Sequence, residues 1–425
     1  DLVINTNRDD LFSSPVITVQ AGDVNLDGTT VSLGSLGDYD DPADPTANLN
    51  FTLVDATGAG TVSANGATVD ASGYFDFYYQ EFGIRTEGGK IVVTGMVKTE
   101  NAFMDAANTA NSEAGANLLW NNRGNAPKGT QLGDLREAVR NDIQSGNTSR
   151  AARSMAAAAG STVNALGTAQ KDALRDQMGW IRNRTTLMGV NPAYVNEDLP
   201  YFHMWMEGTG SYAKLDTKGD ESGYQLTTWG GTVGMDVDLS DHFTMGAAFT
   251  ANYGDLTASA ADSADGHLDS YYANLFGRYQ SKRWAHTLIL TGGWNDAKLN
   301  RTVNYGEGSY RTQGNTNGWG FGAMYELTYD VYLNEDKSSI LQPLANASVV
   351  TTRMDGYTET GAGNAGLNVG KQEWTTGTVA LGGRWMGLVG SNIFGREALA
   401  EFRVNAAQDM GDRRGEANVA LLGNP

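Results

Sequence analysis

The chain has 425 residues, which at about 150 residues per domain predicts two or three domains. Lys and Arg together number 30 and Asp and Glu 49, so the formal net charge is −19. This acidic balance argues against a nucleic-acid-binding protein, which needs a basic surface, and we expect no nucleic-acid partner. The sequence has no cysteine, which excludes a disulfide scaffold, a thiolate metal site and a cysteine nucleophile.

Other counts restrict the class further. The 54 glycines, 18 tyrosines and 9 tryptophans, against 4 histidines, favour many short strands joined by tight turns. The sequence has no run of 18 apolar residues, which excludes an α-helical membrane span but not a β-barrel, whose strands alternate. The chain starts at Asp1 without an initiator Met or a signal peptide, so we expect a mature or processed fragment.

Residues 1–100 are predicted to form short strands separated by turns rich in Gly, Asn, Asp and Ser. The β-rich runs are Val16–Val19, Phe51–Val54, Tyr74–Tyr79 and Lys90–Thr94. We expect a small β-sandwich or the last rungs of a β-solenoid.

Residues 101–199 change to a helical pattern. One helix is predicted within Asn101–Trp120, a charged helix over Leu132–Ile143 and an Ala-rich helix over Arg150–Ala159. Ser161 or Thr162 is a suitable N-cap for a longer helix over Val163–Met188. At 1.5 Å per residue this helix has a length of roughly 40 Å, more than the thickness of the hydrocarbon core of a membrane.

From residue 200 onward, apolar and polar side chains alternate in successive segments of about ten residues. A soluble β-sandwich also alternates, with its apolar face toward a core. Aromatic residues at segment ends and an opposite face of Gly, Thr, Asn and charged residues favour an outer-membrane barrel with a polar lumen. The aromatic residues expected to form girdles at the membrane interfaces are Trp229, Phe243, Tyr253, Trp284, Trp294, Trp319 and Tyr329.

These segments resemble the translocator β-domain of the autotransporters (type V secretion). Met204–Leu215 resembles the first barrel strand of that family and Trp229–Val237 the second. Tyr272–Tyr279 and Leu290–Trp294 fall where its fourth and fifth strands lie, and Ala398–Val404 resembles a late strand. The resemblance covers about 220 residues by order and spacing of the segments.

The resemblance also implies a helix inside the barrel, and Ala165–Arg184 is similar to that helix. Its polar side chains, expected to face the lumen, are Lys171, Asp172, Arg175, Asp176, Arg182 and Arg184. The predicted lumen face of the strands offers Asp236, Asp238, Glu326 and Asp330 as counter-charges. The alternative is an amphipathic helix that packs on a soluble core.

The resemblance implies a fold and a division of the chain. The fold is all-β with a helical insert: a transmembrane antiparallel β-barrel of twelve strands, plugged by an α-helix and preceded by a small β-solenoid or sandwich segment. Residues 1–100 would end the passenger, 101–199 would be a helical linker with a pore-spanning helix over about 162–190, and 200–425 the barrel. Nine strands and the start of a tenth, Glu416–Leu422, precede Pro425, so we expect the protein to continue past that residue.

Three motifs of the sequence are similar to sites of other chemistry. Asp23–Gly28 is similar to the start of an EF-hand loop, but Gly34 stands where a carboxylate is required, so we expect a polar turn. The Gly318, Gly320 and Gly322 series predicts a strand with small lumen-facing residues, not a nucleotide loop. His267 and Asp269, with Asp262 and Asp265 nearby, indicate either an acid–base site at a barrel rim or an acidic loop.

The expected function is an outer-membrane translocator that anchors its own N-terminal passenger and exports it to the surface of a Gram-negative cell. No enzymatic activity, cofactor or metal is expected. The resemblance implies outer-membrane lipid and lipopolysaccharide, the barrel-insertion machinery, periplasmic chaperones and the passenger itself as partners. The alternatives are a passive porin or OmpA-like structural barrel with a periplasmic N-terminal domain, and an outer-membrane hydrolase. Asn183 and the pair Asn121 and Asn122 are candidate sites for passenger cleavage.

Overall fold

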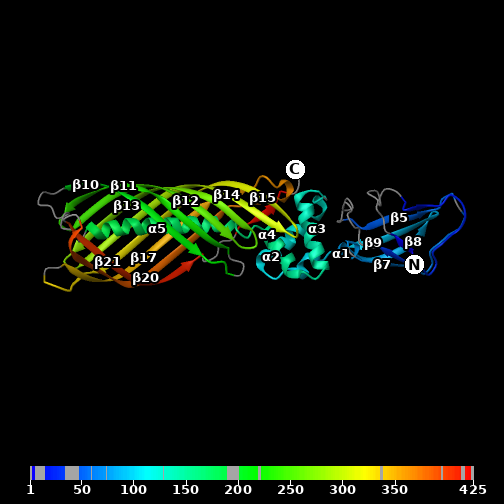
Figure 1. Cartoon of the computed structure of the whole chain (residues 1–425), viewed down its shortest axis with the longest axis horizontal. Coiled ribbons are helices and arrows are strands. Elements are labelled where there is room, and N and C mark those ends of the chain that lie inside the picture. Colours follow the sequence, from blue (N-terminus) through cyan, green and yellow to red (C-terminus); the bar gives the residue numbers. More distant parts are fainter. Residues whose placement is uncertain are drawn as a thin grey trace.

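A computed structural model of the chain describes residues 2–4, 15–33, 47–58, 60–72, 74–127, 129–188, 201–218, 222–335, 338–393, 396–412 and 417–422. Three parts follow one another along the long axis of the molecule (Figure 1). A β-rich N-terminal part is joined to a cluster of short helices, and these lie at one end of a large sheet that curves around one long helix.

The N-terminal strands stack in parallel, although they are distant in the sequence. Strand β4 (Thr30–Leu33) pairs with β1 (Leu2–Ile4) on one side and β7 (Thr68–Ala71) on the other. The parallel pairs β3 (Val24–Asn25) with β6 (Val62–Ser63) and β2 (Ile17–Thr18) with β5 (Leu49–Asp55) repeat this arrangement. Antiparallel pairing of β5 with β9 (Lys90–Val97), and of β9 with β8 (Tyr79–Glu87), completes the part. Parallel stacking of this kind is typical of a β-solenoid, which is one of the two forms predicted for this part; the other is a β-sandwich.

The strand predicted over Tyr74–Tyr79 is wrong, because most of this segment is the short helix α1 (Tyr74–Tyr78). The reason is the burial of neighbouring aromatic side chains. Phe77 and Tyr78 are both buried and their ring centroids lie 5.0 Å apart. Consecutive residues of a strand point to opposite faces, so a strand would place one of these rings in solvent.

The helical part contains η1 (Ala102–Ala106), α2 (Ala110–Asn121), η2 (Arg123–Asn125), α3 (Gln131–Gln144), α4 (Thr148–Ala158) and α5 (Val163–Met188). The single helix predicted within Asn101–Trp120 is instead two. The hydroxyl of Thr109 accepts a hydrogen bond from the Ser112 amide and caps a new helix there. Helix α5 has the bounds predicted from the sequence. Among the described residues, no helix is both long enough and apolar enough to cross a lipid bilayer.

The large sheet contains ten antiparallel strands. Its order is β10 (Tyr201–Leu215), β11 (Gly223–Ser240), β12 (Phe243–Ser259), β13 (Ser263–Ser281), β14 (Trp284–Tyr305), β15 (Gly308–Tyr329), β17 (Ser339–Met354), β20 (Gln372–Ile393) and β21 (Arg396–Gly411), and β16 (Val331–Tyr332) pairs with β17. The nine long strands have 15 to 22 residues, more than the predicted ten or so. The extra residues extend the hydrogen-bonded pairing between neighbouring strands toward helices α3 and α4, which contact β14.

The strand predicted from Glu416 does not extend this sheet. Strand β22 (Val419–Leu421) pairs with β19 (Leu367–Val369), which also pairs with β18 (Tyr357–Thr358). The 3-10 helix η4 (Gly363–Ala365) lies between β18 and β19. Leu367, Val369 and Leu421 are buried, so this segment adds to the core beside the helices, and Glu416 lies outside the described residues.

One cluster of buried apolar side chains joins the three parts. It runs from Phe51 and Val93 in the N-terminal sheet through Phe103 and Val139 to Val303 near the end of β14. Helices α2 and α4 approach closely within it, because a Cβ added at Gly115 would lie 1.9 Å from the Met155 carbonyl oxygen. The helices are therefore packed against both the N-terminal part and the end of the large sheet.

Candidate functional site

The concave face of the large sheet encloses helix α5, which contacts β11, β12, β13, β14, β15, β17 and β20 (Figure 1). Three glycines of β15 provide space for it. A Cβ added at Gly318, Gly320 or Gly322 would lie 2.8 Å from Gln170 Nε2, 2.9 Å from Leu174 Cδ2 and 2.6 Å from Met178 Sδ, respectively. Gln170, Leu174 and Met178 are four residues apart and therefore share one helix face. The glycine series is a lumen-facing part of a strand, as predicted.

Helix α5 contributes a close approach of its own. A Cβ added at Gly167 would lie 1.8 Å from Cη2 of Trp374, a buried residue of β20. By contrast, nothing lies within 4 Å of a Cβ added at Gly179. The first turns of α5 thus fit closely against the sheet, and this fit depends on the absence of a side chain at Gly167.

Buried amide side chains bond the helix to the strands. Gln170 donates to the Trp319 carbonyl oxygen at 3.3 Å, and Gln177 donates to Thr250 Oγ1 at 2.8 Å. Both glutamines have no exposed surface. Sequence reasoning missed Gln170, although an uncharged amide among apolar helix positions is a usable signal for a polar enclosure.

Most of the predicted polar residues of α5 reach strand side chains. Asp172 accepts a hydrogen bond from the Tyr224 hydroxyl, and Lys171 Nζ lies 4.0 Å from Asp172. Arg175 lies 3.4 Å from Asp409 Oδ2 and 3.3 Å from Thr378 Oγ1. Asp176 is hydrogen-bonded to Ser211. The polar side of the helix therefore faces polar groups of β11, β20, β21 and β10.

The last turns of α5 lie in a charged environment. Arg184 lies 3.1 Å from Asp236 Oδ1 on β11, and Asp236 is buried. Arg182 interacts electrostatically with Glu326, Glu401 and two strand arginines. Of the counter-charges expected from the sequence, Asp236 and Glu326 thus face α5 arginines.

The two remaining expected counter-charges bind elsewhere. Asp238 accepts from Thr244 at 2.5 Å, and Asp330 accepts from Gln280 at 3.1 Å and Gln342 at 2.5 Å. Asp409, the partner of Arg175, was missed, because the register of β21 against the helix depends on the curvature of the whole sheet.

Sequence reasoning also missed a buried cluster around Arg384 of β20. Its guanidinium donates to Gln342 Oε1 at 2.8 Å and to Thr186 Oγ1 at 2.5 Å, and lies 3.7 Å from Glu326. Arg403 donates to Glu326 at 2.5 Å. The cluster joins α5 to β15, β17, β20 and β21, and its signal in the sequence is an arginine at a lumen-facing position.

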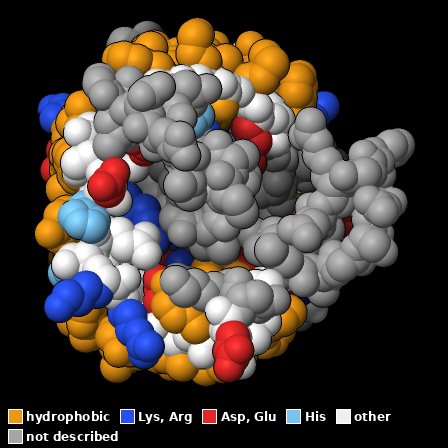
Figure 2. Space-filling model, turned by 90° about the vertical axis from the view of Figure 1, so that its left-hand side faces the viewer, with side chains coloured by type: hydrophobic (Ala, Val, Ile, Leu, Met, Phe, Trp, Pro, Cys, Tyr) orange, Lys and Arg blue, Asp and Glu red, His pale blue; other side chains and the backbone are white. Residues whose placement is uncertain are grey.

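The outer face of the sheet is apolar, and Figure 2 shows hydrophobic side chains around most of its circumference. The predicted girdle residues lie on this face. The ring centroids of Trp229 and Tyr253 lie 5.0 Å apart and those of Trp284 and Tyr329 lie 4.8 Å apart, while Trp294 and Trp319 are cross-strand neighbours. Phe243 pairs with Tyr279. The exposed fractions of Trp229, Trp294 and Trp319 are 59 %, 51 % and 46 %.

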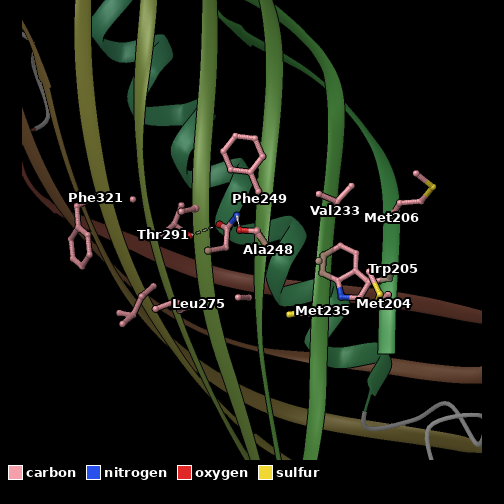
Figure 3. A pocket seen from close by; sticks show the side chains of 16 residues that line it. Met204, Trp205, Met206, Val233, Met235, Ala248, Phe249, Leu275, Thr291 and Phe321 are labelled. Carbon is pink, nitrogen blue, oxygen red and sulfur yellow. Dashed lines mark hydrogen bonds between the residues drawn. The ribbon is translucent and has the colours of Figure 1, made fainter. Parts of the chain in front are cut away.

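A groove of about 990 Å³ lies on this outer face (Figure 3). Met204, Met206, Phe249 and Leu275 border it, and the small residues Ala247, Ala273 and Gly292 line it. Helix α5 lies behind the strands in the same view. An apolar groove on an exposed apolar surface fits contact with hydrocarbon chains.

The other motifs form hydrogen bonds that fix turns and strands. Asp23 accepts from the Thr61 amide at 2.7 Å and Asp27 from the Asn65 amide at 2.5 Å, so both carboxylates bind the neighbouring strand β6 and its turn. Hydrogen bonds from Thr61 and Ser63, respectively, lower the pKa values of Asp23 and Asp27. Gly34 lies outside the described residues. Within the described ranges, no three His, Asp or Glu side chains are grouped for metal binding.

The candidate acid–base residues do not come together. His267 Nδ1 lies 2.7 Å from Asp255, and both side chains are about two-thirds exposed. Asp269 is the cross-strand neighbour of Tyr253 and Asp296. Asp262 is buried against Arg301, and Asp265 lies 3.4 Å from the exposed Arg311. Asn121, Asn122 and Asn183 lie within or directly beside helices α2 and α5.

Parts of the chain are similar to known proteins. The chain is 34 % identical over 182 residues to esterase EstA of Pseudomonas aeruginosa, covering 42 % of this chain and 26 % of that protein. It is 28 % identical over 181 residues to an extracellular serine protease of Serratia marcescens, covering 42 % and 16 %. The chain thus matches only 26 % and 16 % of the length of these relatives. Among solved structures, it is similar to the translocator domain of the autotransporter NalP from Neisseria meningitidis, with 15 % identity, a TM-score of 0.41, and coverage of 63 % and 83 %.

The model of the autotransporter β-domain family matches residues 204–425, more than half of the chain. This range includes all of the large sheet except the first residues of β10. The chain therefore belongs to the autotransporter family, and its large sheet is the outer-membrane translocator of a passenger.

Proposed function

We propose that the chain exports its own N-terminal part through the barrel of its β-domain and retains helix α5 as the segment that spans the pore. The observation that carries this proposal is the course of the chain. Residues 163–188 run along the interior of the sheet, and the helical and N-terminal parts lie together beyond one end of it (Figure 1). If the N-terminal part is moved outward through the barrel, the chain ends in this arrangement.

The proposal assigns a role to each part. Residues 1–100 form the end of the passenger, residues 101–199 form the linker with the pore-spanning helix over about 162–190, and residues 200–425 form the barrel. Parallel stacking of β1, β4 and β7 supports the first assignment, because a stack of rungs can continue into a longer solenoid.

The six polar residues of α5 are proposed to keep the helix in a polar lumen. Bonds of Asp172 to Tyr224, Arg175 to Asp409 and Arg184 to Asp236 support this role. An apolar wall would leave these charges without partners at a high cost in free energy. The lumen face of this barrel is therefore matched to a mixed-charge helix.

The outer aromatics are proposed to lie at the two membrane interfaces. Ten residues separate Phe243 from Tyr253, Trp284 from Trp294, and Trp319 from Tyr329. Ten residues span about 33 Å along a strand, and a tilt of about 40° reduces this to about 25 Å along the membrane normal. This height equals that of the apolar band of outer-membrane barrels. Outer-membrane lipid and lipopolysaccharide are the proposed partners of this surface.

We also propose that the chain has further protein partners and that its described part catalyses no reaction. Insertion machinery and periplasmic chaperones are proposed because the family assembles in the outer membrane. The relatives named as an esterase and a serine protease match this chain over a stretch that covers 26 % and 16 % of their length. We assign the described part of this chain to export and anchoring, and any enzymatic activity to passenger residues outside it.

An epitope tag between Gly88 and Gly89 tests the proposal. These residues form the turn between β8 and β9, where an insertion is well tolerated. On intact cells, protease should remove the tag from the full chain. With residues 163–188 deleted, the tag should remain protected until the outer membrane is opened. A tag that is protected in the full chain would refute export and favour a periplasmic N-terminal domain.

A further inference from the structure

A buried ion cluster lies where helix α5 leaves the sheet and meets α4. Its members are Asp262 from the turn between β12 and β13, Arg301 from β14 and Glu359 from the loop between β18 and β19. The side chains of Asp262 and Arg301 have no exposed surface, and that of Glu359 is 2 % exposed. Arg301 donates to Glu359 through Nε at 2.8 Å and Nη2 at 2.6 Å, and lies 3.4 Å from Asp262.

Each member of the cluster also binds the backbone of a different segment. Asp262 accepts from the Thr162 amide at 3.1 Å and from its hydroxyl at 2.9 Å, directly before α5 begins. Arg301 donates to the Ala157 carbonyl oxygen at 2.8 Å, in the last turn of α4. Glu359 accepts from the Leu367 amide at 3.0 Å. Asp262 and Arg301 therefore bind the connection between α4 and α5 directly, and Glu359 holds Arg301 in place.

The excess charge of the cluster is reduced when the helix is in place. Two carboxylates face one guanidinium, which leaves an excess negative charge in a buried site. The amino terminus of a helix carries a partial positive charge, and α5 begins next to Asp262. While the chain passes through the pore in extended form, α5 has no helical amino terminus beside Asp262, and the Ala157 carbonyl is not in place to accept from Arg301. The cluster is thus complete only after residues 157–163 have reached their final position.

We infer that Asp262, Arg301 and Glu359 form a latch that fixes the connection between α4 and α5 once export ends, and so holds the helical part over the mouth of the pore. This inference rests on the proposed function for the direction of export. The latch acts at the end of transit: it opposes backward sliding of the chain and limits leakage of solutes through the barrel. It does not bind substrate and takes no part in moving the passenger.

The experiment compares full-length Arg301→Met with wild type and with Arg311→Met in detergent micelles. Arg311 is a matched control, because it is a β15 arginine whose pair with Asp265 is exposed. Hydrogen exchange of the amides of residues 157–168 should be at least about tenfold faster in R301M, since a buried charge network is broken, and unchanged in R311M. Exchange in residues 176–184, at the other end of α5, should change less than in residues 157–168. Single-channel recordings should show more open events for R301M.

Exchange of residues 157–168 in folded R301M within twofold of wild type would overturn the latch. Heat-modifiable migration on gels reports whether each variant has a folded barrel. If R301M does not fold, the isosteric variants Asp262→Asn and Glu359→Gln take its place, with the same criterion. Protease accessibility of the tag in R301M cells should equal that of wild type. A wild-type tag that is never exposed would refute the proposed function, whereas the exchange measurement still decides whether the cluster fixes the helix.

Discussion

Arg184, near the end of helix α5, lies 3.1 Å from Asp236 of strand β11, and its guanidinium also lies over the ring of Trp205 at 4.9 Å. The carboxylate of Asp236 is fully buried, and His203 contacts its other oxygen at 3.1 Å. This pair joins two segments 52 residues apart and fixes the end of the helix opposite the latch. The helix is thus bound to the sheet by charged groups at both ends.

The pair predicts a large effect of removing one partner. Arg184→Met should lower the free energy of unfolding by about 3 kcal/mol, because it leaves a buried carboxylate without its guanidinium. Urea unfolding in detergent measures the change. Lys214→Met is the control, since Lys214 and Asp216 form an exposed pair, and it should leave the free energy of unfolding nearly unchanged. Equal effects of the two variants would contradict a buried ion pair at Arg184.

Replacing either of two glycines of α5 with alanine should change stability in opposite directions. Gly167→Ala should destabilise the folded chain by about 1 to 3 kcal/mol, because its methyl group would overlap the ring of Trp374. Gly179→Ala meets open space and should stabilise the chain by up to about 1 kcal/mol through helix propensity. Thermal unfolding of the two variants, followed by heat-modifiable migration, separates them. A stabilising G167A would show that the helix does not pack against β20 as described.

Replacing a glycine of the sheet should affect stability differently on its inner face, toward α5, and on its outer face. Gly322→Val directs a branched side chain at Met178, whereas Gly292→Val on neighbouring β14 points to the outer face, where the nearest atoms are 4.0 Å away. We expect G322V to lower stability by about 1 to 3 kcal/mol and G292V to be within about 0.5 kcal/mol of wild type. Protease resistance of residues 163–188 in purified protein measures the seating of the helix. Loss of resistance in G292V alone would reverse the assignment of faces.

The N-terminal strands predict a pH dependence. Hydrogen bonds from Thr61 and Ser63 hold the pKa values of Asp23 and Asp27 below their usual value of 3.8. A lowered pKa in the folded state means that these carboxylates stabilise the fold above pH 3.8, and that this stabilisation is lost as the pH falls through the lower folded-state values. Asp27→Asn should therefore reduce the acid sensitivity of this part. The rate of proteolysis between pH 2 and 5 measures this sensitivity. Asp105→Asn is an exposed control, and a similar response of both variants would contradict the assignment.

The sequence predicted the strands and the long helix because both have strong periodic patterns. Alternation at Phe243–Tyr253 and helical spacing of Leu166, Leu174 and Met178 depend on a single buried face, which is a local property. The same patterns cannot give contacts between distant segments. The pairing of Arg175 with Asp409, 234 residues away, depends on the curvature of the sheet and the depth of the helix within it.

The errors arise where contacts with other segments override the local pattern. Tyr74–Tyr79 is rich in β-forming residues, but packing of Phe77 against Phe103 and Tyr78 selects a helical turn. Val419–Leu421 alternates as a barrel strand does, yet it pairs with Leu367–Val369 beside the helices. The latch was missed because Asp262, Arg301 and Glu359 lie up to 97 residues apart. Asp262 was assigned only to a candidate acid–base site or acidic loop, and Arg301 and Glu359 belong to no recognisable motif.

The most direct test of the account is the side of the membrane on which each end of the barrel lies. Because the chain has no cysteine, single-cysteine variants at exposed positions report only the introduced site. A membrane-impermeant maleimide on intact cells should label Glu113→Cys in α2 and Glu307→Cys in the turn between β14 and β15. It should label Asp241→Cys, in the turn between β11 and β12, only after the outer membrane is opened. Labelling of Asp241→Cys on intact cells, with Glu113→Cys protected, would contradict export of the N-terminal part.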